Sequence, residues 1–196
     1  RRCCTSRRSM TRSVRAIFSH GPVAGISESS SRNQPSERRS PNSKKLTAAE
    51  RETLRIAIEA EVELRAIGVV SNEEIDEINI LNASFLAMHR ALDQLPCRPE
   101  HLLIDGNRFN AYSTIRHSCI IGGDGLYRAI AAASVLAKTY RDALMLSLHE
   151  EYPVYGWNTN KGYATARHRA ALVEAGPCVH HRKSFAHVRQ PELCAE

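Results

Sequence analysis

Hydrophobic and polar residues follow two rhythms along the central part of the chain, one typical of helices and one of strands. Apolar positions recur every three or four residues in stretches that predict helices over about 47–67, 71–95, 127–149 and 164–174. Short apolar runs between them predict strands at 68–70, 102–104 and 119–121. Because helices alternate with strands, the pattern indicates an α/β domain.

Local signals support the bounds of two of these helices. Thr47 with Glu50, and Ser71 with Glu74, have the spacing of capping boxes, in which each side chain bonds to the other residue's backbone amide. The helical pattern of the second segment is interrupted at Asn79–Asn82. We therefore expect helices that start at residues 47 and 71, the second with a break.

The two ends of the chain differ from this central part. Residues 1–42 are rich in Ser, Arg, Asn and Pro, which predicts an aberrant or disordered basic segment, with only 14–18 and 23–26 as possible short strands. Residues 191–196 form a short tail. The folded domain is thus expected at 43–190.

The formal charge of +6 comes from the N-terminal stretch. Residues 1–45 hold eleven Lys or Arg and two Glu, a net charge of +9, and the remainder carries −3. Overall basicity therefore gives no argument for nucleic-acid binding by the folded part, and any basic groove there must come from local clusters.

Cysteine spacing and hydropathy bear on the compartment. The six cysteines include no CxxC pair, which favours a reducing compartment and predicts a cytoplasmic protein; Cys97 and Cys119 are expected as small core or loop residues. No apolar run approaches the roughly 18 residues of a membrane span. We expect no membrane association.

Two aspartates stand out as candidates for chemistry. Asp105 and Asp124 each lie beside glycine at the end of a predicted strand. An Asp-Gly pair is more often a turn, but neighbouring parallel strands would bring both carboxylates to one edge of a sheet. Two carboxylates there suit a hard metal ion bound to a phosphate substrate. Asp142, within a predicted helix, is better explained as a surface charge or ion pair.

Two downstream segments combine basic and aromatic residues. Residues 160–168 place glycine, Tyr163 and basic side chains at a helix start, where backbone amides favour anions and the ring could stack on a sugar or base. Residues 180–183, with sequence HHRK, form a basic cluster. Taken alone, such a cluster is more often a solvated patch than a binding site.

Taken together and in order, several segments resemble ribonuclease HII, the type 2 bacterial ribonuclease H. The matching segments are 42–47, 73–92, 104–107, 122–124, 130–142, 152–168 and 181–185. The resemblance implies a ribonuclease H-like mixed sheet flanked by helices, in a monomeric protein. It also implies an endonuclease that cleaves RNA in RNA–DNA hybrids and incises at single ribonucleotides in duplex DNA, leaving a 5′-phosphate and a 3′-hydroxyl.

The resemblance also implies the site residues. The family binds two Mg²⁺ or Mn²⁺ ions through an adjacent Asp-Glu pair and the aspartates of a DG and a GD motif, which match Asp105 and Asp124. Tyr163 matches a tyrosine that packs at the ribose-to-deoxyribose junction. The other substrate-binding candidates in matching segments are Ser43, Lys44, Lys161 and Arg182.

The first strand of the family has no clear counterpart here. Ser27 stands in place of the aspartate, Glu28 is the nearest match to the glutamate as a catalytic metal ligand, and the Gly-Arg-Gly turn that follows is absent. A reading-frame or gene-model error upstream of residue 42 is the favoured explanation, ahead of a divergent inactive paralogue and of a transit peptide. In each case the first strands of the sheet are missing or non-native.

This departure sets an expectation for activity. At most three carboxylates remain, Asp105, Asp124 and Glu28, so the metal sites should be weak and cleavage low or absent, with marginal stability. The alternative function is a non-catalytic protein of the same shape that binds RNA–DNA hybrids.

Overall fold

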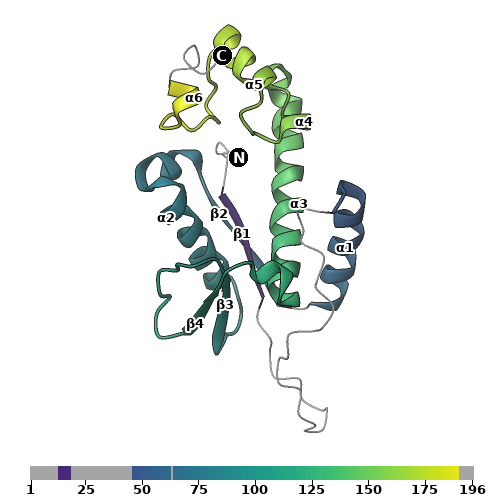
Figure 1. The fold of residues 1–196 in the computed structure, drawn as a ribbon, viewed down its shortest axis with the longest axis vertical. Coiled ribbons are helices and arrows are strands. Elements are labelled where there is room, and N and C mark those ends of the chain that lie inside the picture. Colours follow the sequence, from purple (N-terminus) through teal and green to yellow (C-terminus); the bar gives the residue numbers. More distant parts are fainter. Residues whose placement is uncertain (1–12, 19–45, 63, 190–196) are drawn as a thin grey trace, which may run out of the picture. The chain divides into compact units, whose positions relative to one another are not determined.

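The computed structural model describes residues 13–18, 46–62 and 64–189 (Figure 1). Its elements, in chain order, are β1 (Ser13–Phe18), α1 (Ala48–Glu61), β2 (Arg65–Val70), α2 (Asn72–Asp93), β3 (His101–Asp105), β4 (Arg116–Ile120), η1 (Gly123–Gly125), α3 (Arg128–Glu151), η2 (Pro153–Tyr155), α4 (Trp157–Asn160), α5 (Ala166–Ala175) and α6 (Ala186–Arg189). The alternation of helices and strands confirms the α/β class. Of the two short strands considered before residue 42, residues 14–18 lie in β1, and 23–26 fall outside the described residues.

Helix α1 begins as predicted and ends earlier. Glu50 N–H donates to Thr47 Oγ1 at 3.2 Å, and Thr47 N–H donates to Glu50 Oε2 at 2.7 Å, so the capping box is present. The prediction of helix to residue 67 was wrong, because α1 ends at Glu61 and Arg65–Val70 forms strand β2. Burial alternates along β2, a strand pattern that the apolar spacing of the preceding helix obscured.

Gly68 explains how β2 lies against α2. A Cβ at this position would come 1.7 Å from the carbonyl oxygen of Ala87, so only glycine permits the close approach of strand and helix. Arg90 Nη1 donates to the carbonyl of Val69 at 2.9 Å and ties the same strand to the same helix.

Helix α2 contains the predicted break. Asn79 has a left-handed φ of 65° with ψ 165°, which interrupts the helical hydrogen bonds. Its Oδ1 accepts from the backbone N–H groups of Leu81 and Asn82, at 3.0 and 3.1 Å. Asn79 therefore caps the second part of α2, a usual role for asparagine at a helix start.

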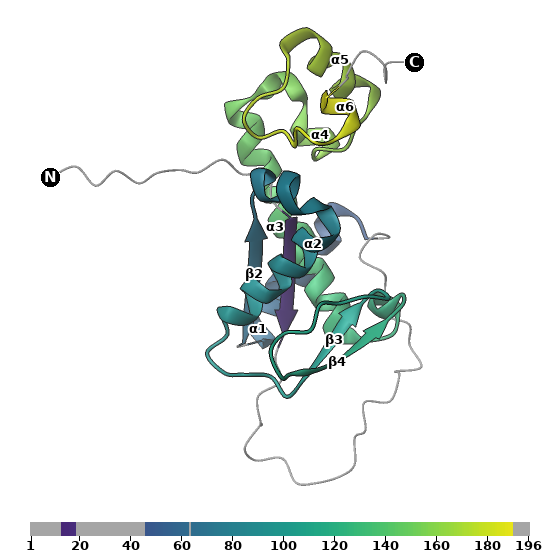
Figure 2. The same ribbon diagram turned by 90° about the vertical axis from the view of Figure 1, so that its left-hand side faces the viewer.

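The described strands pair two by two, β1 with β2 and β3 with β4. Strands β3 and β4 run parallel (Figure 2). Their register places His101 opposite Arg116 and Asp105 opposite Ile120. A hydrophobic core packs against β3, and its buried members are Ala66, Ala91, Leu92, Leu102, Ile104 and Ile115.

The chain divides into two compact units, and α2 and α3 each contribute residues to both. We call the described residues within 14–69 and 85–139 the sheet unit, and those within 70–84 and 140–189 the C-terminal unit.

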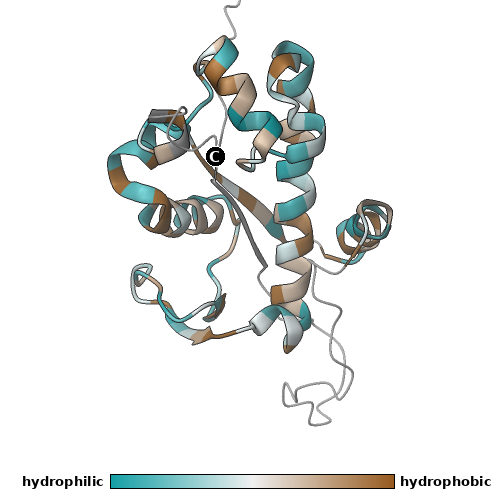
Figure 3. Ribbon diagram, turned by 45° about the horizontal axis from the view of Figure 1, so that its top comes forward, coloured by the Kyte–Doolittle hydropathy of each residue, from teal (hydrophilic) through white to brown (hydrophobic). Residues whose placement is uncertain are grey.

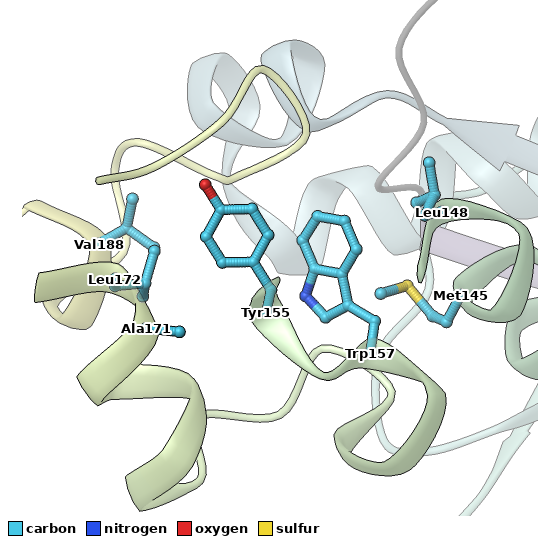
Figure 4. Packing of buried hydrophobic residues seen from close by; sticks show 7 residues of the cluster. All are labelled: Met145, Leu148, Tyr155, Trp157, Ala171, Leu172 and Val188. Atoms are coloured by element: carbon cyan, nitrogen blue, oxygen red, sulfur yellow. The ribbon is translucent and has the colours of Figure 1, made fainter. Parts of the chain in front are cut away.

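Aromatic side chains dominate the core of the C-terminal unit. Tyr155 and Trp157 stack with ring centroids 5.0 Å apart, and α3 and α5 add apolar side chains around them (Figure 4). The buried members are Met145, Leu148, Tyr155, Trp157, Ala171, Leu172 and Val188. Residues 152–157, expected as an aromatic loop, therefore include the short helix η2 and contribute side chains to the core.

Hydropathy varies around the helices, which carry both hydrophilic and hydrophobic residues on their turns (Figure 3). None of the residues of α1 is buried, and Ile56 on this helix is 57% exposed. Of the described helices, none is long and apolar enough to cross a membrane.

The two cysteines expected as core or loop residues are both exposed. Cys97 lies in a loop, as expected, and Cys119 lies on β4, so neither is a core residue.

Candidate active site

Two aspartates follow the two parallel strands of the sheet unit. Asp105 is the last residue of β3, and its neighbour Gly106 donates its N–H to the carbonyl of Ile120 at the end of β4, at 2.9 Å. After β4 the chain turns at Gly122, whose φ is +67°, and enters the short helix η1 with Asp124 at its centre. Asp105 thus ends one of two neighbouring parallel strands and Asp124 follows the C-terminal end of the other, as the sequence predicted.

A backbone contact joins the two segments. Gly123 N–H donates to Asp105 Oδ1 at 3.0 Å, so the carboxylate of Asp105 lies beside the residue that precedes Asp124. Asp105 is exposed, whereas Asp124 is only 6% exposed. A Cβ on Gly123 would lie 2.5 Å from Ile130 Cδ1 on α3, so the absence of a side chain lets η1 pack closely against that helix.

The chemistry of these side chains suits a hard divalent cation, since Mg²⁺ and Mn²⁺ prefer carboxylate oxygens. Asp105 and Asp124 are the residues that would hold such an ion. Within 46–62 and 64–189, no group of three or more His, Cys, Asp or Glu side chains is placed to hold a metal. The described site therefore fits the ion in donor type and supplies part of a ligand set.

The other part of the family's ligand set would involve Glu28. Glu28, Ser43 and Lys44 all lie outside the described residues. Asp142, expected as a surface charge or ion pair, is half-buried on α3.

In the C-terminal unit, Tyr163 projects from a tight turn. We call residues 160–163 the Tyr163 turn. Lys161 and Gly162 both have left-handed backbones, with φ of 49° and 80°, and Tyr163 N–H donates to the carbonyl of Asn160 at 2.8 Å. The Tyr163 side chain is 63% exposed.

Arg182 lies in a loop that one carboxylate holds in place. The N–H groups of Lys183 and Ser184 donate to the two carboxylate oxygens of Asp76 at 2.7 and 3.0 Å. The guanidinium of Arg182 lies 3.8 Å above the centre of the Phe185 ring. Burial, followed by the nearby charge of Arg141, lowers the pKa of Arg182 to about 10, against the opposing effect of Asp76.

The two neighbouring histidines are core residues, and the interpretation of 180–183 as a solvated patch was wrong for them. His180 and His181 are 6% and 5% exposed. His180 packs edge-on against Tyr152, with centroids 5.2 Å apart, and His181 packs against Tyr155 at 4.6 Å. The apolar faces of the imidazoles fill the aromatic core, which a local charge count does not reveal.

Sequence reasoning also missed His168. It is 2% exposed, and its Nδ1 lies 3.1 Å from the carbonyl oxygen of Tyr155, within hydrogen-bonding distance. Its ring stacks on His181, with an interplanar angle of 19°. The available signal was helical spacing, because His168 is three and four residues before the core residues Ala171 and Leu172.

Comparison with known proteins identifies the family. Residues 32–188 match the family model of ribonuclease HII. The ribonuclease HII of Bacteroides thetaiotaomicron is 64% identical over 144 residues, which cover 74% of this chain and 72% of that protein. The Porphyromonas gingivalis ribonuclease HII is 58% identical over the same shares of both chains. The chain belongs to the ribonuclease HII family. Members of this family are nucleases that hydrolyse RNA in RNA–DNA hybrids.

Solved structures support the fold at low sequence identity. The ribonuclease H2 of Pyrococcus horikoshii superposes with a TM-score of 0.63 at 21% identity, covering 77% of this chain and 79% of that one. A ribonuclease HII from Archaeoglobus fulgidus, solved in complex with PCNA, gives a TM-score of 0.56 at 23% identity, covering 75% of this chain and 78% of that one. These likenesses establish a ribonuclease H-like fold.

The match to the family model covers all of the candidate site residues except Glu28. Asp105, Asp124 and Tyr163 lie within the 32–188 match to ribonuclease HII, together with the binding candidates Ser43, Lys44, Lys161 and Arg182. Glu28 precedes that range, so its role as a metal ligand remains a prediction from the residues around it.

Proposed function

We propose that this chain is an endonuclease that cleaves RNA in RNA–DNA hybrids and incises at single ribonucleotides embedded in duplex DNA. The products would carry a 5′-phosphate and a 3′-hydroxyl. The observation that carries the proposal is the pair of aspartates after parallel strands, joined by the 3.0 Å contact from Gly123 N–H to Asp105 Oδ1. Family membership supports the substrate class.

Asp105 and Asp124 are the proposed metal-binding and catalytic residues, with Glu28 as a third. Two Mg²⁺ or Mn²⁺ ions bound there would supply an activated water and stabilise charge on the leaving 3′ oxygen. The backbone N–H of Gly123 donates to Oδ1 of Asp105 and thereby favours one orientation of this carboxylate beside η1.

We propose two kinds of substrate contact, one by an aromatic ring with a sugar and one by polar side chains with the phosphate backbone. Tyr163, with its exposed ring, would pack on the sugar at the ribose-to-deoxyribose junction. The cationic side chains of Lys44, Lys161 and Arg182 would contact backbone phosphates, and Ser43 would donate a hydrogen bond to the same backbone.

A second candidate is a non-catalytic protein that binds RNA–DNA hybrids. It is favoured by the small ligand set, because the described residues place two aspartates and no third metal-binding side chain beside them. Such a protein would keep the binding residues and lack stable metal sites. The two candidates share a substrate and differ in hydrolysis.

Cleavage of labelled duplexes separates the candidates. The purified chain is mixed with an RNA–DNA hybrid, a DNA duplex that contains one ribonucleotide, and an all-DNA duplex, with Mn²⁺, Mg²⁺ or EDTA. We expect slow, metal-dependent cuts in the first two substrates, with 3′ ends that a polymerase extends. Binding of the duplexes with no cuts supports the second candidate, and the absence of both binding and cuts rejects both.

We further propose that the enzyme is a cytoplasmic monomer that acts in the removal of ribonucleotides from DNA. The scattered cysteines support a reducing compartment. Size-exclusion chromatography with light scattering tests the monomeric state, and a dimer mass at micromolar concentration contradicts it.

A further inference from the structure

The Tyr163 turn has a strained backbone that hydrogen bonds from Asn160 and Arg141 hold in place. Lys161 has a φ of 49°, in the left-handed region that residues other than glycine rarely adopt, and Gly162 follows with a φ of 80°. A strained backbone of this kind persists only where the surrounding contacts fix it, and it is concentrated at functional sites. The contacts that hold this turn are therefore informative.

Asn160 supplies the restraint from within the turn. Its side chain is 8% exposed and makes two hydrogen bonds: Nδ2 donates to the carbonyl of Tyr155 at 2.7 Å, and Oδ1 accepts from Gly162 N–H at 2.8 Å. Its own carbonyl accepts from Tyr163 N–H. Asn160 thus joins the turn to the aromatic core of the C-terminal unit.

Arg141 supplies the restraint from outside the turn. Its Nη2 donates to the carbonyl of Lys161 at 3.1 Å, and a Cβ on Gly162 would lie 3.4 Å from the same nitrogen. A guanidinium makes a strong, charge-assisted bond to a carbonyl and holds a fixed planar geometry. The bond acts on the residue whose backbone is strained.

We propose that Arg141 is a positioning residue that holds the Tyr163 turn in its left-handed conformation and thereby sets discrimination of the ribose-to-deoxyribose junction. The discrimination part rests on the role proposed for Tyr163 above. Arg141 acts through the backbone of the turn, and the ring of Tyr163 makes the contact with the sugar. A displacement of about 1 Å in such a contact costs on the order of a hundredfold in rate.

Amide hydrogen exchange tests the positioning role without any substrate. Arg141→Lys keeps the positive charge and removes the planar fork, so exchange of the Gly162 and Tyr163 amides should become about tenfold faster. Amides in α5 should keep their wild-type rates, which separates local loosening from global unfolding. Wild-type rates at Gly162 and Tyr163 in this variant overturn the proposal.

Arg90→Lys is the matched control. Arg90 makes the same kind of guanidinium-to-carbonyl bond, to Val69 at 2.9 Å, within the sheet unit. The identical substitution there should leave exchange in the Tyr163 turn unchanged. Faster exchange of the turn in this control would show a general loss of stability and overturn a specific role for Arg141.

A double-mutant cycle with Tyr163→Ala tests discrimination. The measured quantity is the ratio of cleavage rates for a single-ribonucleotide duplex and a continuous hybrid. Arg141→Lys should reduce this ratio about tenfold in the wild-type background and leave it unchanged in the Tyr163→Ala background, because both act through one ring. Equal reductions in the two backgrounds overturn action through Tyr163.

Failure of the role proposed for Arg141 can be distinguished from failure of the proposed function. If the wild-type chain binds without cleaving, the cycle is read as the ratio of dissociation constants for the same two duplexes. A chain that neither cleaves nor binds rejects the proposed function together with the discrimination role. The exchange rates then still decide whether Arg141 holds the turn.

Discussion

Asp105 accepts a hydrogen bond from the backbone N–H of Gly123, the residue immediately before Asp124, with 3.0 Å between Gly123 N and Asp105 Oδ1. One backbone amide therefore links the carboxylate of the first aspartate to the segment that carries the second. Substitutions at Gly123 change the positions of the candidate ligands, whereas substitutions at the aspartates change their chemistry.

Gly123→Ala should destabilise the protein by about 1–3 kcal/mol, because the new methyl group overpacks against Ile130. The added Cβ would lie 2.5 Å from Ile130 Cδ1, and no backbone atom blocks the site at a shorter distance. Ile130→Val removes that atom, so the double variant should be more stable than the sum of the single effects. Urea unfolding followed by circular dichroism measures this, and additive effects would contradict the contact.

Asp105→Asn should reduce cleavage about a hundredfold or more, because the amide cannot supply the negative charge that a divalent cation requires. The amide oxygen can still accept from Gly123 N–H, so the free energy of unfolding should change by about 1 kcal/mol or less. Rates on the RNA–DNA hybrid in Mn²⁺ give the first quantity. Asp93→Asn, which alters a carboxylate bonded to Tyr112 in the same unit, is the matched control and should keep the wild-type rate.

Acid should destabilise the protein through its buried histidines. Burial lowers the pKa of His168, against its hydrogen bond with the Tyr155 carbonyl, and burial also lowers the pKa of His180, against the charges of Glu151 and Glu73. The unfolded chain takes up protons on both residues as the pH falls through about 6.5, while the folded chain does not until lower pH. Stability is therefore complete above that pH and lost below it, by at most about 1.4 kcal/mol per pH unit for each histidine.

Urea unfolding at pH 7.5, 6.5 and 5.5 measures this dependence. His168→Gln should flatten it, since the substituted side chain does not titrate. His101→Gln, at an exposed position on β3, is the control and should keep the wild-type slope. A slope that is unchanged in His168→Gln contradicts the assignment of the acid effect to the buried imidazole.

Asp76→Asn should loosen the loop that carries Arg182. The carboxylate accepts from the N–H groups of Lys183 and Ser184, and an asparagine amide can replace only one of its two acceptor oxygens. We expect a loss of about 1–3 kcal/mol in stability and weaker duplex binding. Glu77→Gln, on an exposed position of the same helix, serves as the control.

Salt titration distinguishes the roles of these residues in binding. Asp76→Asn removes no phosphate contact, so the slope of log Kd against log salt should equal that of the wild type. Arg182→Ala should reduce the slope by about 0.9 if its guanidinium neutralises one phosphate. A reduced slope in Asp76→Asn would show that the loop no longer presents its cations.

Features that depend on local contacts were predictable from the sequence. The capping boxes at Thr47 and Ser71 and the break at Asn79 each involve residues two or three positions apart, so a short window contains the whole interaction. Residues 65–67 of strand β2 were mistaken for helix because the apolar spacing of the preceding helix obscured their alternating burial, which comes from packing against residues far away in the sequence.

In the candidate site, too, local features were predictable and features that depend on distant contacts were not. Asp105 and Asp124 were found because carboxylates beside glycine at strand ends are visible in the sequence. Arg141 and Asp76 were missed because their partners are backbone carbonyl and amide groups, which every residue carries. The burial of His180 depends on aromatic rings elsewhere in the chain, such as Tyr152, so it cannot be predicted from the basic residues that surround His180 in the sequence.

Trp157 gives the C-terminal unit an optical reporter of its own. It is the sole tryptophan of the chain and is 1% exposed in the core of the C-terminal unit, so its emission reports on the unfolding of that core. Unfolding of the aromatic core exposes the indole to water and shifts its fluorescence to longer wavelength. A fluorescence transition that precedes the loss of circular dichroism would show that the two units melt separately, and coincident transitions would show one cooperative protein.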